Sequence, residues 1–496
     1  MRVLWLCNIC PPAVAAALGL PCSVREGWIT GALNRYLEAG AAEQEGVATE
    51  QKSAAPGRRD TASGLELGIC FPAEGEAARL GEDVFLTPFR GGGEGKEAQS
   101  GTSLRDASRG AGGASRDASR ETAHNSSEEA IQAAGRRVRL YGFYEDLRRP
   151  EVYDSSMEER FSQILKEFRP DLVHIFGTEF PHALAMARVF PRPERLLVGM
   201  QGLMGECTAH YMADLPPRIQ NRATLRDRLR RDSLRQQQEK FALRAQRERE
   251  TLALCGHVAG RTEFDREGSL ALNPKAVYHT MNETMRDCFY EGSWSREACR
   301  SHWIFASQGD YPLKGLHYLL QAMPAILRTF PDARLCVAGN SITRYGSWKE
   351  KLKISGYGKY LRELIRENGL EGHVTVTGQL SAGQMKEAFL GSHIFVCPSA
   401  VENSPNSLGE AMLLGVPCAA ARTGGIPSMA EDGREALFFE KGDVDGIARC
   451  VTAVFRDDAL ARRLSAGAAA RARRNHDGDA NYRQLLETYR QILGGK

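Results

Sequence analysis

Two glutamates lie on either side of a predicted helix start in the segment 397–417, CPSAVENSPNSLGEAMLLGVP. We expect a strand to end at Pro398, a loop to carry Glu402 and a helix to begin near Asn406. The first backbone N–H groups of a helix are unpaired and the helix dipole is positive there, which suits a bound diphosphate. Because a carboxylate accepts hydrogen bonds from hydroxyl groups, Glu402 and Glu410 could hold a ribose or a hexose attached to that diphosphate.

A structural explanation of the same glutamates competes with this one. Glutamate is common in the first turn of a helix, because its charge interacts favourably with the dipole. Two glutamates at this spacing also occur by chance in many chains. The complete run is more specific, because Pro-Ser stands before the loop and Gly-Val-Pro follows the helix.

The elements that would position these residues alternate along the chain. Short apolar or β-branched runs are separated by longer helical patterns, and near-continuous apolar strands are typical of parallel sheets covered on both faces. Two runs of such alternation predict two doubly wound α/β domains, whose ligands bind beyond the carboxyl ends of the strands, in the cleft between the domains. The predicted strands are 3–8, 65–71, 138–143, 172–177, 196–201 and 257–260 in the first half, and 303–307, 334–339, 374–378, 394–398, 417–421 and 436–439 in the second.

The predicted domain boundary lies just before residue 301. The first domain covers 1–295 and the second covers 301–478, and a final helix over 479–496 has an apolar face that could pack back on the first domain. Within the first domain, 41–63 and 91–135 contain too few large apolar residues to offset the entropy of ordering. We therefore predict that these two stretches are disordered insertions.

The segment around Glu402 and Glu410 resembles the Glu-x7-Glu signature of glycosyltransferase family 4, whose members have the two-domain GT-B fold with two Rossmann-like domains. The resemblance extends in order and spacing over the second half of the chain, and more loosely over the first half. The other segments that carry it are SQGDYPLKG at 307–315, LCVAG at 335–339, VTVTG at 374–378, TGGIP at 423–427, VHIFGTEFPH at 173–182 and GRTEFD at 260–265.

This resemblance implies a binding site for a nucleoside-diphosphate sugar, the donor, in the second domain. Glu402 would contact the transferred sugar and Lys314 would neutralise the diphosphate as a point charge, so these two are the expected catalytic residues. Glu410 would hold the ribose, and N–H groups at the helix start would bind phosphate or sugar oxygens. The expected donor-binding residues are Lys314, Gly378, Glu402, Asn406, Ser407, Leu408 and Glu410.

The first domain would then bind the acceptor, and here the chain departs from the family pattern. Many members carry an arginine a few residues before the lysine, where this chain reads QGDY, and Arg261 is our candidate to replace its charge. Members often end a first-domain strand with histidine, where this chain has Gln201. For each histidine below, a structural role is the alternative. The expected acceptor-side residues are His174, Glu179, His182, Gln201 and Arg261.

The implied reaction transfers a hexose-type sugar from a nucleoside diphosphate to a saccharide or lipid-linked saccharide, with retention of configuration, in cell-surface polysaccharide synthesis. The resemblance implies neither a metal nor a cofactor, and we interpret Asp443 of the Asp-Val-Asp sequence as a helix N-cap. The alternatives are a GT-B epimerase or phosphorylase and, because the loop arginine is missing, a catalytically weak sugar-nucleotide-binding protein.

Charge and hydropathy indicate where the chain would act. The net charge of +3 names no partner, and the lack of an apolar run of about 20 residues predicts a cytoplasmic protein, with peripheral association at the inner face of the plasma membrane as an option. The stretch 217–250 is strongly basic. It predicts either a solvated long helix with i,i+4 ion pairs or a contact with an anionic membrane that brings a lipid-linked acceptor to the cleft. Nucleic-acid binding is not expected, because no aromatic residues are interleaved with the charges.

Overall fold

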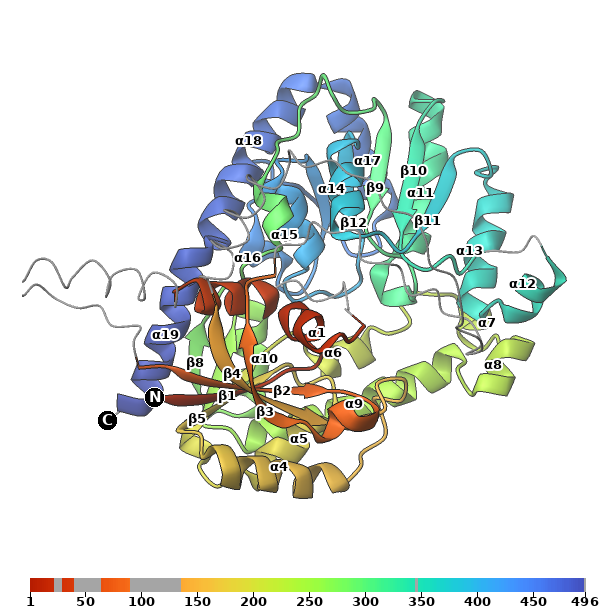
Figure 1. Ribbon diagram of the computed structural model, residues 1–496. Coiled ribbons are helices and arrows are strands. Elements are labelled where there is room, and N and C mark those ends of the chain that lie inside the picture. Colours follow the sequence, from red (N-terminus) through yellow and green to blue (C-terminus); the bar gives the residue numbers. More distant parts are fainter. Residues whose placement is uncertain (22–28, 40–63, 90–134, 344–346, 495–496) are drawn as a thin grey trace, which may run out of the picture.

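Two helix-flanked sheets make up the protein, one above the other in Figure 1. The first sheet ends at Thr280 and the second begins at Trp303. Apart from Gly135, the insertions predicted at 41–63 and 91–135 lie outside the described residues. The computed structural model describes residues 1–21, 29–39, 64–89, 135–343 and 347–494.

The first sheet has the order β3-β4-β2-β1-β5-β6-β7-β8, and all its neighbours are parallel except β3 and β4. Every strand predicted in this half is present within two residues of its predicted bounds. The edge strands β3 and β8 were not predicted, because an edge strand is paired on one side only and most of their residues are at least partly exposed. The strands are β1 Arg2–Leu6, β2 Glu66–Pro72, β3 Gly81–Leu86, β4 Arg136–Phe143, β5 Leu172–Phe176, β6 Leu196–Gly199, β7 His257–Gly260 and β8 Val277–Thr280.

The second sheet is wholly parallel, with the order β11-β10-β9-β12-β13-β14. The strand order reverses between β9 and β12, and the carboxyl ends of strands at such a reversal are where doubly wound sheets bind ligands. The prediction of two doubly wound domains is confirmed. The strands are β9 Trp303–Ala306, β10 Arg334–Ala338, β11 Val374–Gly378, β12 Ile394–Cys397, β13 Cys418–Arg422 and β14 Leu437–Glu440.

Helices cover both sheets, and their apolar faces fill the cores beneath them. Besides a helical run over 29–39, those of the first half are α1 Pro12–Leu18, α4 Ser156–Phe168, α5 Pro181–Val189, α6 Met204–Ala209, α7 Pro217–Gln220, α8 Leu225–Arg230, α9 Leu234–Ala253 and α10 Glu263–Leu272. Those of the second half are α11 Leu316–Thr329, α12 Trp348–Lys353, α13 Gly356–Glu367, α14 Ala382–Leu390, α15 Asn406–Leu413, α16 Ile426–Met429, α17 Val444–Arg456, α18 Asp458–Asn475 and α19 Gly478–Gly494.

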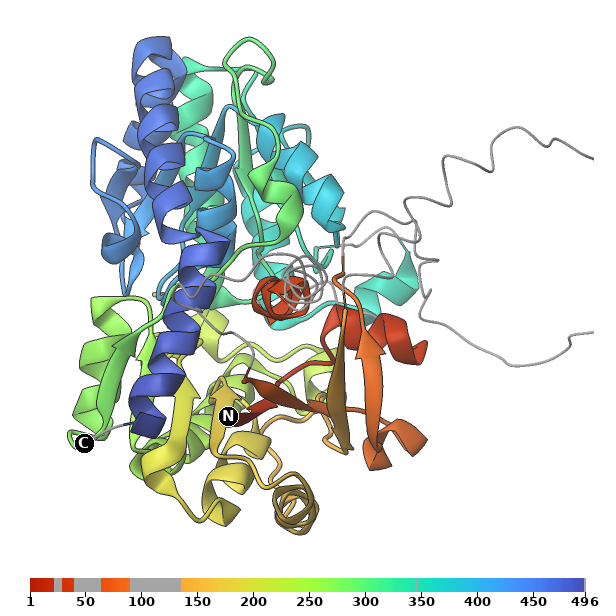
Figure 2. The same cartoon turned by 60° about the vertical axis from the view of Figure 1, so that its left-hand side comes forward.

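The last helix crosses back to the first sheet. Figure 2 shows α18 and α19, in blue, running along the second half and then the first. The Trp5 indole N–H donates to the Tyr489 hydroxyl over 2.8 Å, and that hydroxyl lies 2.8 Å from Nδ1 of His174. Leu485 and Ile492 belong to the same buried cluster as Trp5. The first half therefore completes its core with the end of the chain.

A second crossing connects the halves through residues 211–234, which we call the bridging segment. The core of the second half includes its apolar side chains Tyr211, Met212, Leu215, Ile219 and Leu234. The backbone carbonyl of Ala213 lies 2.8 Å from Nε2 of His317, and the Tyr318 hydroxyl donates to Asp214 over 2.6 Å. In sequence this segment falls inside the predicted first domain of 1–295, but it packs with α11 and the core of the second half.

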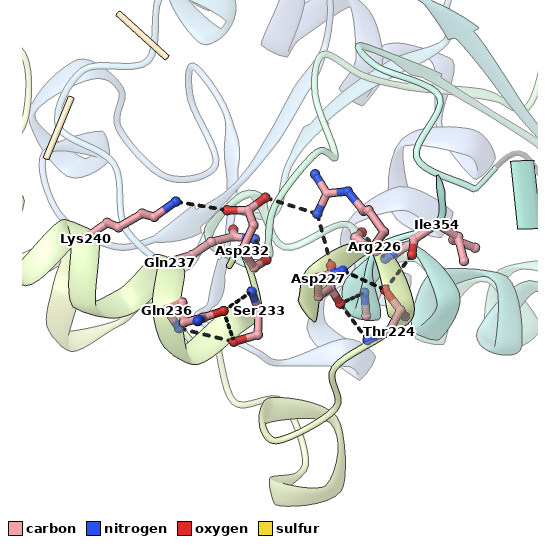
Figure 3. Close-up of polar contacts among 12 residues, drawn as sticks. Thr224, Arg226, Asp227, Asp232, Ser233, Gln236, Gln237, Lys240 and Ile354 are labelled. Carbon is pink, nitrogen blue, oxygen red and sulfur yellow. Dashed lines mark hydrogen bonds and ion pairs between the residues drawn. The ribbon is translucent and has the colours of Figure 1, made fainter. Parts of the chain in front are cut away.

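The prediction of one long helix over 217–250 is wrong, because the stretch forms α7, α8 and α9. Thr224 and Ser233 each begin a new helix with a capping box, and Arg231 has a left-handed φ of 50° between them. Figure 3 shows the capping contacts of Thr224 with Asp227 and of Ser233 with Gln236. Local side-chain hydrogen bonds thus break a basic run that looks continuous in sequence.

Candidate active site

A cavity of about 420 Å³ lies between the two halves. The second half supplies the ends of β9, β10 and β12 and the start of α15, which is the strand reversal expected to bind a ligand. The first half and the linker supply Gln201, Arg261 and Arg286. We call this space the donor cavity.

Lys314 and Glu402 meet in the donor cavity. The Lys314 ammonium donates to Oε1 of Glu402 over 2.6 Å, and Ser399 donates to the same oxygen over 2.8 Å. Burial opposes the charge on Lys314, but the adjacent Glu402 carboxylate outweighs it and raises the pKa of the ammonium above its usual range. The structure thus holds a fixed cation beside a carboxylate that has further lone pairs free for hydroxyl donors.

Two glycines place this pair. Gly315 follows Lys314 with a φ of 69°, and a Cβ there would lie 1.8 Å from the carbonyl oxygen of Pro398. Gly424 has a φ of 52°, and a Cβ there would lie 1.9 Å from the carbonyl oxygen of Glu402. The Lys-Gly and Thr-Gly-Gly segments of the sequence therefore let two backbone turns approach the loop of Glu402 closely.

Helix α15 begins at Asn406, as predicted, with Pro405 as its N-cap residue. Asn406 and Ser407 line the donor cavity, and Oδ1 of Asn406 is buried without a hydrogen-bond partner among the described residues. The N–H of Leu408 already donates to the carbonyl of Pro405 over 3.0 Å, and its side chain lies in the core. The donor groups available at this helix start are therefore those of Asn406 and Ser407.

Glu410 also lines the donor cavity, but it has a partner that the sequence did not indicate. Nε and Nη2 of Arg286 donate to its two carboxylate oxygens, each over 2.8 Å. Burial raises the pKa of Glu410, and the Arg286 guanidinium offsets part of that rise. Arg286 lies in the linker between the sheets. A single arginine in the sequence does not indicate which carboxylate it will pair with. This pair brings a second cation to the donor cavity.

Arg261 and Gln201 face the donor cavity from the first half. The Arg261 guanidinium pairs with Glu283 and donates to the carbonyl of Met200 over 3.0 Å, and the Gln201 amide donates to Glu283 over 3.0 Å. The charge of Arg261 is thus already compensated. Of the two arginines that reach the cavity, Arg286 lies closer in the structure to the α15 residues, because it contacts Glu410 directly.

Gly378 ends β11 with a φ of 87°. Its two successors, Gln379 and Leu380, line the donor cavity, whereas Gly378 itself does not. Gly378, expected to bind the donor, therefore forms a turn that places the next two residues in the cavity wall.

The two expected acceptor-side histidines lie in the core of the first half. Burial lowers the pKa of His174 to about 3, so this ring stays neutral beside Tyr489. His182 is fully buried, and its Nδ1 lies 2.7 Å from Oε2 of Glu145. His174 touches a small cavity of about 60 Å³, and neither histidine lines the donor cavity. Their contacts support the structural alternative, because strand and helix packing accounts for both rings.

A second cavity of about 650 Å³ adjoins the donor cavity and shares Gln201, Lys314 and Glu402 with it. We call it the acceptor-side cavity. Of the expected acceptor residues, Glu179 and Gln201 line it. Its other walls include the ring pair of Tyr211 and Phe241, whose centroids lie 4.9 Å apart, and the bridging segment. Aromatic faces next to carboxyl and amide groups are suited to binding a sugar.

Asp443 caps α17, as predicted. Its carboxylate accepts from the backbone N–H of Gly446 over 2.8 Å and pairs with Arg449 at 2.9 Å. This contact accounts for the first aspartate of the Asp-Val-Asp sequence.

Residues 303–471 match the family model of the glycosyl transferases group 1. The chain is 26% identical over 190 residues to a phosphatidyl-myo-inositol mannosyltransferase of Mycobacterium leprae, covering 38% of this chain and 46% of that protein. It is also 26% identical over 182 residues to a D-inositol 3-phosphate glycosyltransferase of Corynebacterium urealyticum, covering 36% and 41%. The chain therefore matches less than half the length of these curated relatives.

Solved structures show the same overall fold. A sucrose-phosphate synthase from Thermosynechococcus elongatus superimposes with a TM-score of 0.61 at 12% identity, covering 100% of both chains. Anabaena HepE in complex with UDP superimposes with a TM-score of 0.56 at 14% identity, covering 98% of this chain and 99% of the other. The predicted GT-B fold is confirmed. None of the helices in the described ranges combines the length and apolar character needed to cross a bilayer.

Proposed function

We propose that the protein is a glycosyltransferase that moves a hexose-type sugar from a nucleoside-diphosphate sugar to a saccharide or lipid-linked saccharide. One observation carries the proposal. Lys314, the start of α15 and the carboxylates of Glu402 and Glu410 all converge on the donor cavity. This set offers positive charge for a diphosphate and acceptors for hydroxyl groups in one place.

The diphosphate is proposed to lie between the Lys314 ammonium and the N–H groups of Asn406 and Ser407. An ammonium has three N–H donors, so Lys314 can keep its bond to Glu402 and still bind an oxygen of the leaving group. Positive charge fixed where negative charge develops lowers the barrier to breaking the sugar–phosphate bond. In this proposal Glu402 holds the hydroxyls of the transferred sugar and Glu410, steadied by Arg286, holds the ribose.

The acceptor is proposed to enter the acceptor-side cavity, because that cavity shares Lys314 and Glu402 with the donor cavity. A saccharide there would place a hydroxyl beside the reacting carbon. The names of the relatives support this class of reaction, since they are a mannosyltransferase and a glycosyltransferase, and one structural neighbour holds UDP. Membership of family 4, retention of configuration, the absence of a resident metal or cofactor and a cytoplasmic role in cell-surface polysaccharide synthesis are parts of the same proposal.

A thermal-shift screen with UDP, GDP and ADP and their hexose conjugates tests the donor site. We expect one nucleotide series to raise the melting temperature, because ligand that binds only the folded state stabilises it. Lys314→Ala should weaken binding of that nucleotide by about 10- to 100-fold, the loss of one charge-assisted hydrogen bond. Lys359→Ala, which removes an exposed lysine on α13, is the matched control.

Turnover with a labelled donor and a saccharide acceptor mixture tests the reaction. Glu402→Gln should reduce turnover far more than it reduces nucleotide affinity. Stabilisation by no nucleotide, or equal kinetics in both variants and the wild type, would remove the site. Epimerised sugar or phosphate-dependent cleavage without transfer would favour the epimerase or phosphorylase, and tight binding without any turnover would favour a binding protein.

A further inference from the structure

Two short helices present apolar side chains outward on one edge of the molecule. Figure 1 shows α8 and α12 beside each other at this edge. On α8, Leu225 is 56% exposed and Leu229 is 77% exposed, and on α12 Trp348 is 67% exposed and Leu352 is 47% exposed. Each pair has i,i+4 spacing, so both members lie on one face of their helix. Large apolar side chains gathered on exposed faces mark an interaction surface.

Exposed basic residues accompany these apolar residues on the same two helices. In the parts of the chain that the structure describes, no carboxylate lies within ion-pair distance of Arg228, Arg230 or Arg231. The acidic residues of the two helices are engaged, since Asp227 is buried and Glu350 accepts from the backbone N–H of Ser347 over 2.9 Å. The exposed cations of the surface are Arg228, Arg230, Arg231, Lys349, Lys351 and Lys353.

Contacts between the halves hold α8 and α12 as one surface. The Thr224 hydroxyl donates to the carbonyl of Ile354 over 2.8 Å, a contact drawn in Figure 3. Oδ2 of Asp227 accepts from the backbone N–H of Gly356 over 2.8 Å, and Arg222 pairs with Glu363 at 2.7 Å. The surface therefore exists before any partner binds, which lowers the entropic cost of binding.

We propose that α8 and α12 together form a docking surface for an anionic membrane. Leucine and tryptophan side chains can enter the boundary between headgroups and acyl chains, while arginine and lysine stay among anionic headgroups. The charge supports this partner, because six exposed cations lie on or next to the same two helices as the four exposed apolar side chains. A nucleic acid would use the cations and leave the leucines in water.

The surface differs from the contact that the sequence suggested over 217–250. Several basic side chains of α9 bind the protein itself, since Lys240 pairs with Asp232 at 3.4 Å and Arg244 donates to the carbonyl of Glu179 over 2.7 Å. Within that stretch only α8 and its C-cap Arg231 belong to the docking surface, and α12 from the other half completes it.

The docking surface adjoins the acceptor-side cavity. Arg226 and Asp232 from the bridging segment and Ser355, just after α12, line that cavity. A docked protein would therefore hold this end of the cavity at the headgroup layer, where a lipid-linked acceptor is found. This role in acceptor delivery rests on the proposed transferase function, whereas the docking itself does not.

Co-sedimentation of the full chain with vesicles tests the docking. We expect binding to vesicles of 70% phosphatidylcholine and 30% phosphatidylglycerol, little binding to pure phosphatidylcholine, and loss of binding at high salt. The variant Arg228→Gln/Arg230→Gln/Arg231→Gln should bind roughly 100-fold more weakly, from about 1 kcal/mol for each cation near the surface. The matched control removes three exposed arginines of α18, as Arg463→Gln/Arg473→Gln/Arg474→Gln.

A second variant, Leu229→Ser/Trp348→Ser, should weaken vesicle binding and leave its salt dependence in place. Equal binding by the two arginine variants, equal binding to neutral vesicles, or no binding to either would overturn the proposal. If the wild type self-associates in sedimentation velocity and the Leu229→Ser/Trp348→Ser variant does not, the surface is instead a contact between copies of the chain. The nucleotide found in the thermal-shift screen should still stabilise these variants, which tests the donor site separately. The membrane proposal and the transferase proposal can therefore be refuted independently.

Discussion

Two of the carboxylates that line the donor cavity each have a basic partner. Glu402 is bonded to Lys314, and Glu410 is bonded through both oxygens to Arg286. A buried carboxylate without such a partner would cost several kcal/mol. The cations therefore stabilise the fold, and in the proposed function they also supply the charge that a diphosphate requires.

The Arg286–Glu410 pair gives a prediction for stability and binding together. Arg286→Met leaves Glu410 buried without compensation, so it should lower the free energy of unfolding by about 3–5 kcal/mol. Adding Glu410→Gln removes the unpaired buried charge. The double variant should therefore recover most of the lost free energy of unfolding, but it should not recover nucleotide affinity. Urea unfolding of the two single variants and the double variant forms the cycle that checks this. A double variant no more stable than Arg286→Met would show that the pair is not coupled.

Glu248 gives a prediction for pH dependence. It accepts from the Thr178 hydroxyl over 2.7 Å and from the N–H of Met204 over 2.9 Å, and burial raises its pKa to about 7. The folded state holds this proton more tightly than the unfolded state. The stability it contributes is therefore complete below the unfolded pKa of about 4.5 and is lost as the pH rises to about 7.

Glu248→Gln removes this titration. The stability of the wild type relative to the variant should fall between pH 4.5 and pH 7.5, by on the order of 3 kcal/mol. Urea unfolding of both proteins across this range measures the difference, because titrating groups that do not interact with Glu248 contribute equally to both. A constant difference would mean that the Glu248 carboxyl titrates alike in both states.

At the scale of elements, the sequence predicted what depends on local pattern. Apolar runs located the central strands, and Pro405 with its polar neighbours located the start of α15. The same reasoning missed β3 and β8, whose residues are mostly exposed, and it read 217–250 as one helix. The bridging segment could not be predicted, because its apolar residues show that it has a buried face but not which half buries it. Arg286 was missed for a related reason, since only the fold brings it to Glu410.

The contacts of α8 with Ile354 and Gly356 give a prediction at this scale. Asp227→Ala removes the acceptor of the Gly356 N–H and the side chain that completes the capping box of α8, which should cost about 1–3 kcal/mol. Hydrogen exchange should become faster at Gly356 and through 222–232, as measured by mass spectrometry. Asp443→Ala, which removes the cap of α17 but no contact between halves, is the control. Equal exchange in the two variants at Gly356 would contradict a role of Asp227 in holding α8 against this segment.

At the scale of the whole molecule, the two halves are joined by the linker, the bridging segment and the passage from α18 to α19. The GT-B architecture and the return of the last helix were both within reach of the sequence, because the strand alternation and the apolar face of 479–496 are long patterns. The shape of the acceptor-side cavity could not be predicted from the sequence, because its walls come from both halves and from the bridging segment.

Tyr489 tests the contribution of α19. Tyr489→Phe removes the acceptor of the Trp5 N–H and the partner of His174, both buried, and should lower the melting temperature by several degrees. Tyr144→Phe, at a side chain that is 56% exposed, should change nothing. Differential scanning calorimetry compares them, and an unchanged transition in Tyr489→Phe would mean that the hydroxyl contributes nothing to the stability of the first half.

The packing of α19 on β1 has a consequence for biosynthesis. Trp5 and Tyr489 are 484 residues apart, and at about 5–20 residues per second a ribosome needs on the order of a minute to make the chain between them. During that time the earliest strand leaves the exit tunnel with its closing helix still unmade. The apolar surface around Trp5 is then open to chaperones, and the first half reaches its final packing only after translation has passed residue 492.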